Sequence, residues 1–166
     1  MRQAKRYRYV GPPEIATQLL APTGMPVRFA DDIEKLSDAG LVADEPMTFT
    51  VGSDLVLRLA HRRSEHVACA GGQEVLAAGE LTLRRDDQGW LVTYASNQSI
   101  GYCPEPESWE DLAAVLDSLA VRHSGDYSAM FIFRRCVACG SLNVVKDGWF
   151  VCSFCGVDLP PEWNVG

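Results

Sequence analysis

The chain has 166 residues, of which 47% are hydrophobic and 22% are charged, and its net charge is −7. These values are ordinary for a globular protein with one full domain and a small appendage. No apolar run approaches the length of a membrane span, and the basic N-terminus, with Arg2, Lys5, Arg6 and Arg8, lacks the apolar segment of a signal peptide.

The first twenty residues predict a short strand followed by a short helix. Residues 7–10 form the expected strand. Pro13 suits the first turn of the helix, where its missing N–H costs nothing. Ile15, Leu19 and Leu20 would then lie on one side of that helix.

The next segment predicts a second strand and a second short helix. Residues 27–29 form the strand, and either Asp31 or Asp32 caps the helix, because a carboxylate there accepts hydrogen bonds from free backbone N–H groups. Gly40 is the expected stop, since glycine adopts the left-handed conformation that ends many helices.

The middle of the chain predicts two β-hairpins. Residues 47–51 and 55–59 alternate between apolar and polar side chains and flank a Gly-Ser-Asp turn. Residues 75–83 and 90–95 form the second pair of strands, which turns at residues 86–89.

The strongest helical pattern follows these hairpins. Ser108 and Asp111 have the spacing of a capping box, and the helix should end before Gly125. Apolar side chains recur at helical spacing behind this start, at Trp109, Leu112, Leu116 and Leu119.

An apolar strand at residues 130–133 then runs directly toward Cys136 without a flexible linker. We therefore predict an α+β fold with a mostly antiparallel sheet, one main helix and short N-terminal helices. Residues 1–133 form the predicted body, and residues 134–166 form a metal-binding unit continuous with its last strand.

Two C-x-x-C knuckles stand in this C-terminal unit, at Cys136 and Cys139 and at Cys152 and Cys155. A glycine follows each knuckle, and its positive φ lets backbone amides turn toward the sulfur atoms. An Asp-Gly turn at residues 147–148 predicts a hairpin of residues 143–146 with residues 149–151. This hairpin would bring the two knuckles face to face around one metal ion.

The pattern over roughly residues 134–160 resembles a zinc ribbon. The resemblance implies structural Zn²⁺ bound by all four cysteines, with no open coordination position and no metal catalysis. A rubredoxin-like iron site uses the same S4 shell and is the less favoured alternative. Six cysteines, four of them in this pattern, suit a reducing compartment, so we expect a cytoplasmic protein.

Zinc ribbons also serve as protein docking surfaces and as readers of nucleic acid. Here the net charge of −7 lies wholly in residues 1–133, because three positive and three negative charges cancel from residue 134 onward: Arg134, Arg135 and Lys146 against Asp147, Asp158 and Glu162. Phosphate binding needs a concentrated positive surface, so a nucleic-acid partner is not expected.

Two polar loops, residues 61–72 and 96–104, suggest a second site. If residues 75–84 and 90–95 pair as a hairpin, residues 74 and 96 face each other at its open end and both loops meet there. This end lies beside the N-terminus of the main helix, which attracts anions. The candidate ligand-binding residues are Arg62, Arg63, Ser64, Glu65, His66, Asn97, Gln98, Ser99 and Tyr102. Arg62 and Arg63 also have an ordinary explanation as solvated charges, and Asn97, Gln98 and Ser99 as turn or cap residues.

The same loops offer a catalytic alternative. Cys103 or Cys69 would act as a nucleophile activated by His66, with Glu65 orienting the histidine. Buried cysteines that serve only as small apolar residues are the simpler explanation. A second metal site made by His61, His66, Cys69 and Cys103 is chemically possible, although the spacing matches no known knuckle.

Motifs for the common nucleotide and hydrolase sites are absent from the sequence, including G-x-x-x-x-G-K-[ST], G-x-G-x-x-G and G-x-S-x-G. The favoured hypothesis is a non-enzymatic binding or regulatory module for a protein partner or a small anionic ligand. The alternative is a small Cys/His-dependent enzyme of acyl or group transfer, with its site at residues 61–72 and 96–104.

Overall fold

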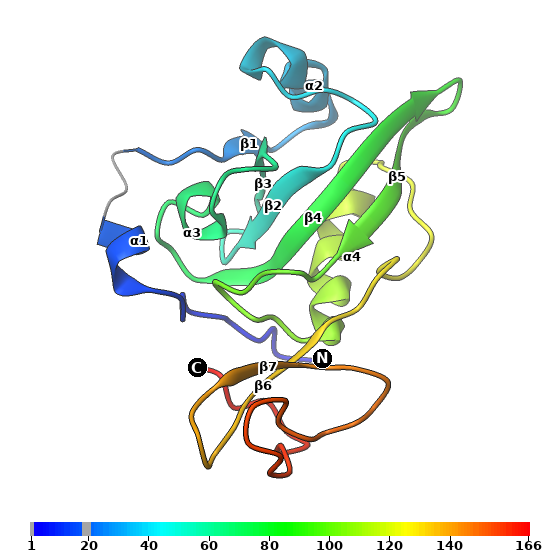
Figure 1. Cartoon of the computed structure of the whole chain (residues 1–166). Coiled ribbons are helices and arrows are strands. Elements are labelled where there is room, and N and C mark those ends of the chain that lie inside the picture. The colour runs from blue at the N-terminus through cyan, green and yellow to red at the C-terminus, as the bar shows by residue number, and fades with distance from the viewer. Residues whose placement is uncertain (1, 18–20) are drawn as a thin grey trace.

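The computed structural model describes residues 2–17 and 21–166, and it has the predicted α+β architecture (Figure 1). A five-stranded antiparallel sheet has the strand order β1-β3-β2-β4-β5. Its strands are β1 (Met25–Val27), β2 (Met47–Gly52), β3 (Leu57–His61), β4 (Val75–Asp86) and β5 (Gly89–Ser96). Both predicted hairpins, β2 with β3 and β4 with β5, are confirmed.

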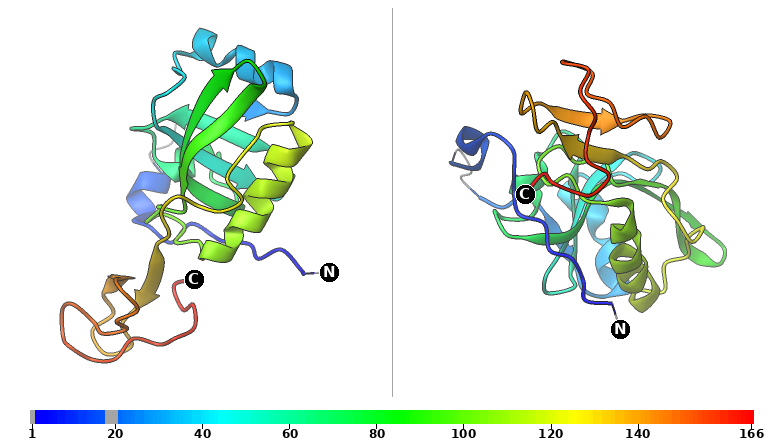
Figure 2. Two further views of the ribbon diagram at one scale, coloured as in Figure 1. Left: turned by 90° about the vertical axis from the view of Figure 1, so that its right-hand side faces the viewer. Right: turned by 90° about the horizontal axis from the view of Figure 1, so that it is seen from below.

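The central strand β2 is buried along its whole length, because both faces of the sheet are covered. On one face, α4 (Trp109–Ser118) contributes Leu112 and Leu116 to the main apolar core (Figure 2, left). On the other face, the short helix α3 (His66–Cys69) packs Val67 against Val75 and Ala78 of β4.

The N-terminal elements are shorter than their sequence patterns suggest. Residues 7–10 do not form the predicted strand, since Tyr7 makes only a single antiparallel bridge with Val75. The helix α1 (Pro13–Thr17) begins at the predicted proline. Leu19 and Leu20, assigned to one side of this helix, lie outside the described residues.

The second helical segment consists of α2 (Ala30–Glu34) and the 3-10 helix η1 (Leu36–Ala39). Gly40 ends it with a φ of 76°, as predicted. The predicted cap is wrong, because Phe29 occupies the N-cap position. The carboxylate of Asp32 instead reaches back and accepts hydrogen bonds from the backbone N–H groups of Arg28 and Phe29, at 2.9 and 3.0 Å, which lowers its pKa.

The expected capping box of α4 is also wrong. The 3-10 helix η2 (Pro106–Ser108) leads directly into α4, and the Ser108 hydroxyl bonds the Tyr127 hydroxyl at 2.9 Å instead of capping the helix. Asp111 lies near Arg2, and burial raises the pKa of its carboxyl. The helix ends at Ser118, before Gly125 as predicted.

A separate two-stranded sheet of β6 (Ile132–Arg135) and β7 (Leu142–Val145) leads into and supports the C-terminal segment, residues 134–166. Asp147 and Gly148 have positive φ values of 52° and 68°, which confirms the predicted turn. The predicted partner of residues 143–146 is wrong, however: β7 pairs with β6, and only Lys146 and Trp149 form a bridge across the turn. This pairing places Val145 beside Cys136 and Cys152 in a small buried cluster.

The predicted last strand of the body therefore belongs to this second sheet, which lies below the body in Figure 1. Within residues 2–17 and 21–166, no helix combines the length and the hydropathy that crossing a bilayer requires.

Candidate metal centre

The four cysteines of the knuckles gather at one point. The Sγ atoms of Cys136 and Cys155 are 3.5 Å apart, those of Cys139 and Cys152 are 3.6 Å apart, and all four lie within 4.8 Å of one another. A tetrahedral S4 shell with metal–sulfur bonds of about 2.3 Å has sulfur–sulfur edges of about 3.8 Å, close to these distances. The separations are far longer than the bond of about 2.05 Å in a disulfide, and all four thiols are free. The four cysteines are thus positioned to bind a metal ion.

The two knuckles have the same backbone geometry. Gly140 donates a hydrogen bond to the carbonyl of Cys136 at 2.9 Å, and Gly156 donates one to the carbonyl of Cys152 at 3.0 Å. The first cysteine of each knuckle also donates to the carbonyl five residues later, at 2.9 and 2.8 Å. Both glycines have the predicted positive φ, 75° and 79°. This repetition explains why two separate loops present their thiols in the same way.

Asn143 of β7 supports the second knuckle, a role that the sequence analysis did not assign. Its buried side-chain amide donates to Cys152 Sγ at 3.4 Å, and its Oδ1 accepts a hydrogen bond from the N–H of Ser153 at 2.9 Å. Burial opposes ionisation of the Cys152 thiol, but hydrogen bonds from the N–H groups of Cys155 and Phe154 and from the Asn143 amide lower its pKa to about 6. These donors favour a thiolate at a position that faces three other sulfur atoms.

The outer surface of the C-terminal segment carries exposed apolar side chains. Trp149 is 71% exposed and Phe154 is 72% exposed. A groove of about 390 Å³ lies beside the second knuckle, and its lining includes Val144, Trp149 and Val151 together with Lys146. The segment therefore has very little apolar interior and a conspicuous apolar exterior.

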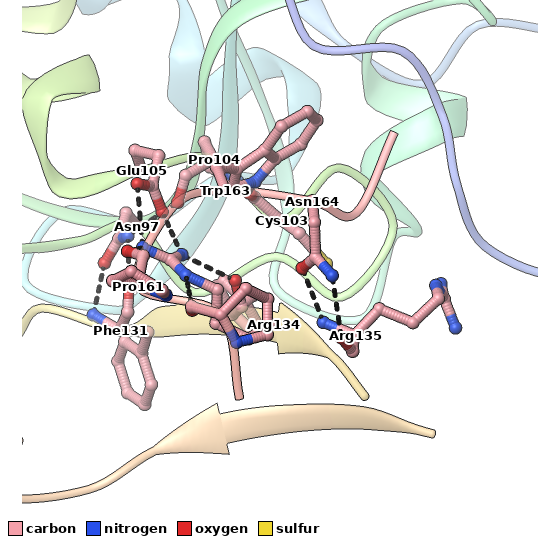
Figure 3. Close-up of polar contacts among 12 residues, drawn as sticks. Asn97, Cys103, Pro104, Glu105, Phe131, Arg134, Arg135, Pro161, Trp163 and Asn164 are labelled. Carbon is pink, nitrogen blue, oxygen red and sulfur yellow. Dashed lines mark hydrogen bonds and ion pairs between the residues drawn. The ribbon is translucent and has the colours of Figure 1, made fainter. Parts of the chain in front are cut away.

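Arg134 joins the C-terminal segment to the body (Figure 3). Its guanidinium is 4% exposed, and each of its five N–H donors has an acceptor. Two hydrogen bonds go to the Glu105 carboxylate of the body, at 2.8 and 3.3 Å. The others go to the carbonyls of Phe133, Pro160 and Pro161.

Asn97, predicted as a ligand-binding residue, is part of the same joint. Its buried amide donates to the carbonyls of Pro104 and Phe131, at 2.9 and 2.7 Å, and it accepts from the Phe131 N–H at 2.7 Å. Its side-chain polar atoms are all used: one donor holds the Pro104 carbonyl, and the other donor and the oxygen hold Phe131 in the chain that enters β6 (Figure 3). Ser99 is buried nearby and accepts a hydrogen bond from the Tyr102 N–H, whereas Gln98 is exposed.

The two predicted loops do meet, but through a filled apolar cluster. Tyr102 of the second loop packs with Val67 and Ala70 of the first, and its hydroxyl donates to the Gln73 carbonyl at 2.8 Å. The predicted register is wrong, because Ser96 pairs with Glu80 and not with residue 74. The first residues of β4 pair with β2 instead.

The charged part of the first loop lies at the surface, away from this cluster. Arg62 and Arg63 are exposed and line a shallow hollow of about 400 Å³ with Glu45 and His61. The Ser64 carbonyl accepts a hydrogen bond from the Thr48 hydroxyl, and Glu65 stands at the N-cap of α3 without a side-chain hydrogen bond to it.

The thiols of the catalytic alternative are buried in separate places. Cys69 lies against the Thr50 hydroxyl and the Arg58 carbonyl, at 3.6 and 3.5 Å, and Cys103 donates to the Ile100 carbonyl at 3.4 Å. Burial raises the pKa of Cys69 to about 11 and that of Cys103 to about 12. Both thiols are therefore held in their neutral, unreactive form.

His66 is occupied elsewhere, because its Nε2 hydrogen-bonds the Gly79 carbonyl at 2.9 Å and burial lowers its pKa. In the described part of the chain, neither thiol is hydrogen-bonded to His66. Within residues 2–17 and 21–166, the four knuckle cysteines form the only cluster of three or more potential metal ligands. The second metal site predicted from His61, His66, Cys69 and Cys103 is therefore not formed.

Comparison of the chain with protein-family models, with curated proteins and with solved structures found no match, so the four-cysteine centre rests on its own geometry.

Proposed function

We propose that this chain is a non-enzymatic binding module, in which a structural zinc ion holds the C-terminal segment and that segment docks a protein partner. The single observation that carries the proposal is the pairing of a four-thiol cluster with an exposed aromatic groove directly beside it. A metal-held loop presents such a groove at a low entropic cost, because its backbone is already ordered before the partner arrives.

Two features of the four thiols favour a soft ion in a structural role, and zinc is the proposed ion. Soft thiolate ligands select zinc or iron over hard cations, and four protein ligands leave no coordination position for a substrate. The repeated knuckle geometry and the Asn143 donor to Cys152 favour a closed structural site. Elemental analysis of the purified chain should give about one zinc per chain. A red protein with iron in that ratio would instead assign the rubredoxin-like site.

Trp149 is the expected anchor of the docking surface. Tryptophan is enriched among the few interface residues that dominate binding energy, and the indole here is mostly exposed at the edge of the groove. Phe154 follows Ser153 of the groove wall and is equally exposed. An apolar side chain of a partner fills this groove in the proposed complex.

Charge indicates which partner fits. Arg134 is buried and paired with Glu105, so the remaining charges of residues 134–166 are two positive and three negative, a net of −1: Arg135 and Lys146 against Asp147, Asp158 and Glu162. With Glu105 left out in the same way, residues 1–133 add −6. A nucleic acid would be repelled, whereas a protein segment with an apolar anchor flanked by Lys or Arg is complementary.

A displayed random-peptide library selected on the zinc-loaded chain tests this proposal. We expect enriched peptides to carry an apolar anchor with basic flanks, and Trp149→Ala should weaken their binding by about tenfold or more. Phe29→Ala is the matched control, because Phe29 is also 71% exposed but lies in the body. Peptides that bind Trp149→Ala as tightly as the parent chain, or that are acidic, would contradict the proposed surface.

A further inference from the structure

The C-terminal tail, residues 159–166, connects the cysteine cluster to the body. Its first residue, Leu159, is buried with Cys136 and Cys152 in the cluster beside the thiols. Val165, near its end, is buried with Cys103 and Phe133 at the joint. One short segment thus belongs to the interior of both regions.

Trp163 in the middle of the tail covers the loop around Cys103. Its indole N–H donates to the Cys103 carbonyl at 2.8 Å (Figure 3). The ring packs edge-on against Tyr7 with centroids 5.5 Å apart, and Lys5 Nζ lies 3.8 Å from the ring centroid. The tail therefore holds the N-terminal segment around Tyr7 as well as the second loop.

Asn164 fixes the tail to the strand that leads into the first knuckle. Its Oδ1 accepts from the Arg135 N–H at 2.9 Å and its Nδ2 donates to the Arg135 carbonyl at 2.7 Å, so the side chain acts like one more strand beside β6. The carbonyls of Pro160 and Pro161 accept from Arg134 (Figure 3). Each of these contacts joins the tail that leaves the second knuckle to the strand that enters the first.

We propose that the tail is a metal-dependent strap: while the four cysteines hold their metal the tail seals Cys103 inside the joint, and loss of the metal releases the tail and opens this surface of the body. The inference rests on the metal of the proposed function but not on its protein partner. Only three residues separate Cys155 from Leu159. The buried residues of the segment's cluster are Cys136, Val145, Cys152 and Leu159, and the partly buried Ile132 and Phe150 pack against them. Half of the buried members are ligands of the proposed metal, so few apolar contacts remain to keep the cluster closed without it.

The two remaining cysteines supply an internal comparison. Cys103 and Cys69 are both 0% exposed, and burial raises the pKa of both thiols. Only Cys103 shares a cluster with the tail, whereas Cys69 is enclosed by α3, β2 and β3 of the body. Opening of the strap should therefore expose one thiol and leave the other covered.

Alkylation with iodoacetamide, read out residue by residue by mass spectrometry, tests the strap. In the zinc-loaded chain we expect slow labelling of both Cys69 and Cys103. After chelation, the four ligand cysteines should label, and Cys103 should react at least about tenfold faster than before, while Cys69 stays slow, as expected for a local opening. The strap would be overturned if Cys103 were still alkylated as slowly as Cys69 after the ligand cysteines have reacted. It would also be overturned if chelation accelerated the alkylation of both thiols equally.

Variants of the tail separate the strap from the metal. Asn164→Ala and Trp163→Ala in the zinc-loaded chain should accelerate Cys103 by about tenfold while the ligand cysteines stay protected and zinc stays bound. Glu162→Ala, which changes an exposed tail side chain, should have no effect. If Cys103 were alkylated slowly in both Asn164→Ala and Trp163→Ala, the strap alone would be overturned. A purified chain that contains no zinc would overturn the proposed function together with the strap.

Discussion

The body and the C-terminal segment are stabilised in different ways. In the body, α4 and the five-stranded sheet enclose a continuous apolar core that includes Phe49, Leu81, Leu112 and Leu116. In the C-terminal segment, the buried apolar cluster consists of Cys136, Val145, Cys152 and Leu159, and larger apolar side chains such as Trp149 are exposed. We therefore expect the first region to fold through its apolar burial, and the second to depend on the proposed metal cross-link between its thiols.

The largest expected effect comes from removing one ligand of that cross-link. Cys152→Ser should reduce bound zinc from about one per chain to near zero, because three thiols no longer close the tetrahedral shell. Residues 134–166 should lose order while the sheet of the body persists, which metal analysis and circular dichroism with thermal melting would measure.

Ser153→Ala is the matched control for this change, since it alters the exposed neighbouring side chain and keeps all four thiols. An unchanged melting curve and an unchanged zinc content in Cys152→Ser would show that the segment folds without the metal, and the contrast between the two regions would fail.

The next effect concerns the joint between the regions. Glu105→Gln leaves the Arg134 guanidinium buried without its counter-charge, and losing one partner of a buried pair costs about 3–5 kcal/mol. Urea unfolding would measure the loss, and Glu107→Gln, at an exposed position, should cost little. If Glu105→Gln had the same free energy of unfolding as the parent chain, the joint would contribute nothing to the stability of the two regions it connects.

The body core supplies the third test. Leu116→Ala truncates a fully buried side chain between α4 and the sheet, which should cost about 2–5 kcal/mol of unfolding free energy. Zinc content should stay at about one per chain, because the thiols are untouched. Val42→Ala, at a 55% exposed position, is the control. Loss of zinc from Leu116→Ala at temperatures where the body is still folded would show that the metal site depends on the core.

The smallest effect is a pH dependence of the body. Burial lowers the pKa of His66 below its ordinary value of 6.5, so at acid pH the unfolded chain takes up a proton that the folded chain resists. Stability from this group is complete above about pH 6.5 and falls as the pH decreases, with a slope of at most about 1.4 kcal/mol per pH unit.

His66→Gln should remove this part of the slope, and His61→Gln, at an exposed position, should keep it. Urea unfolding of parent and variant between about pH 8 and pH 5.5 measures the difference, in which the pH dependence of metal binding cancels. If the free energy of unfolding changed with pH by the same slope in the parent chain and in His66→Gln, His66 would not be buried in its neutral form.

Local chemistry explains what was predictable from the sequence. Gly140 and Gly156 have their positive φ because each knuckle needs it, and the Asp147–Gly148 turn needs it for the same local reason. The strand pairs β2–β3 and β4–β5 follow from alternation and from short turns between neighbouring segments. The four clustered cysteines could likewise be read from spacing alone.

Contacts between distant segments explain what was missed. Arg134 looks like a solvated charge in sequence, and its burial depends on Glu105 and on the carbonyls of Pro160 and Pro161, at least 26 residues away along the chain. The pairing of β7 with β6 was missed because the Asp147–Gly148 turn pointed to the following segment instead. The asparagine inside the apolar run Leu142–Val145 was the one signal in the sequence for a supporting role beside the thiols.

Contacts with distant segments of the chain also occupy side chains of the predicted second site. The two loops meet, as their place in the sheet suggests, but Tyr102 fills the space between them and Asn97 is fully used in the joint. Polarity in a loop did not distinguish a side chain that binds a ligand from one that binds the protein's own backbone.

Hydrogen exchange of the zinc-loaded chain, before and after chelation, tests the central claim most directly. We expect amides of β6, β7 and both knuckles to lose protection when the metal is removed, while amides of β2 and β4 keep theirs. Unchanged protection of β7, or equal loss of protection in β2 and β4, would contradict the claim that the body is held by its core and the C-terminal segment by its metal.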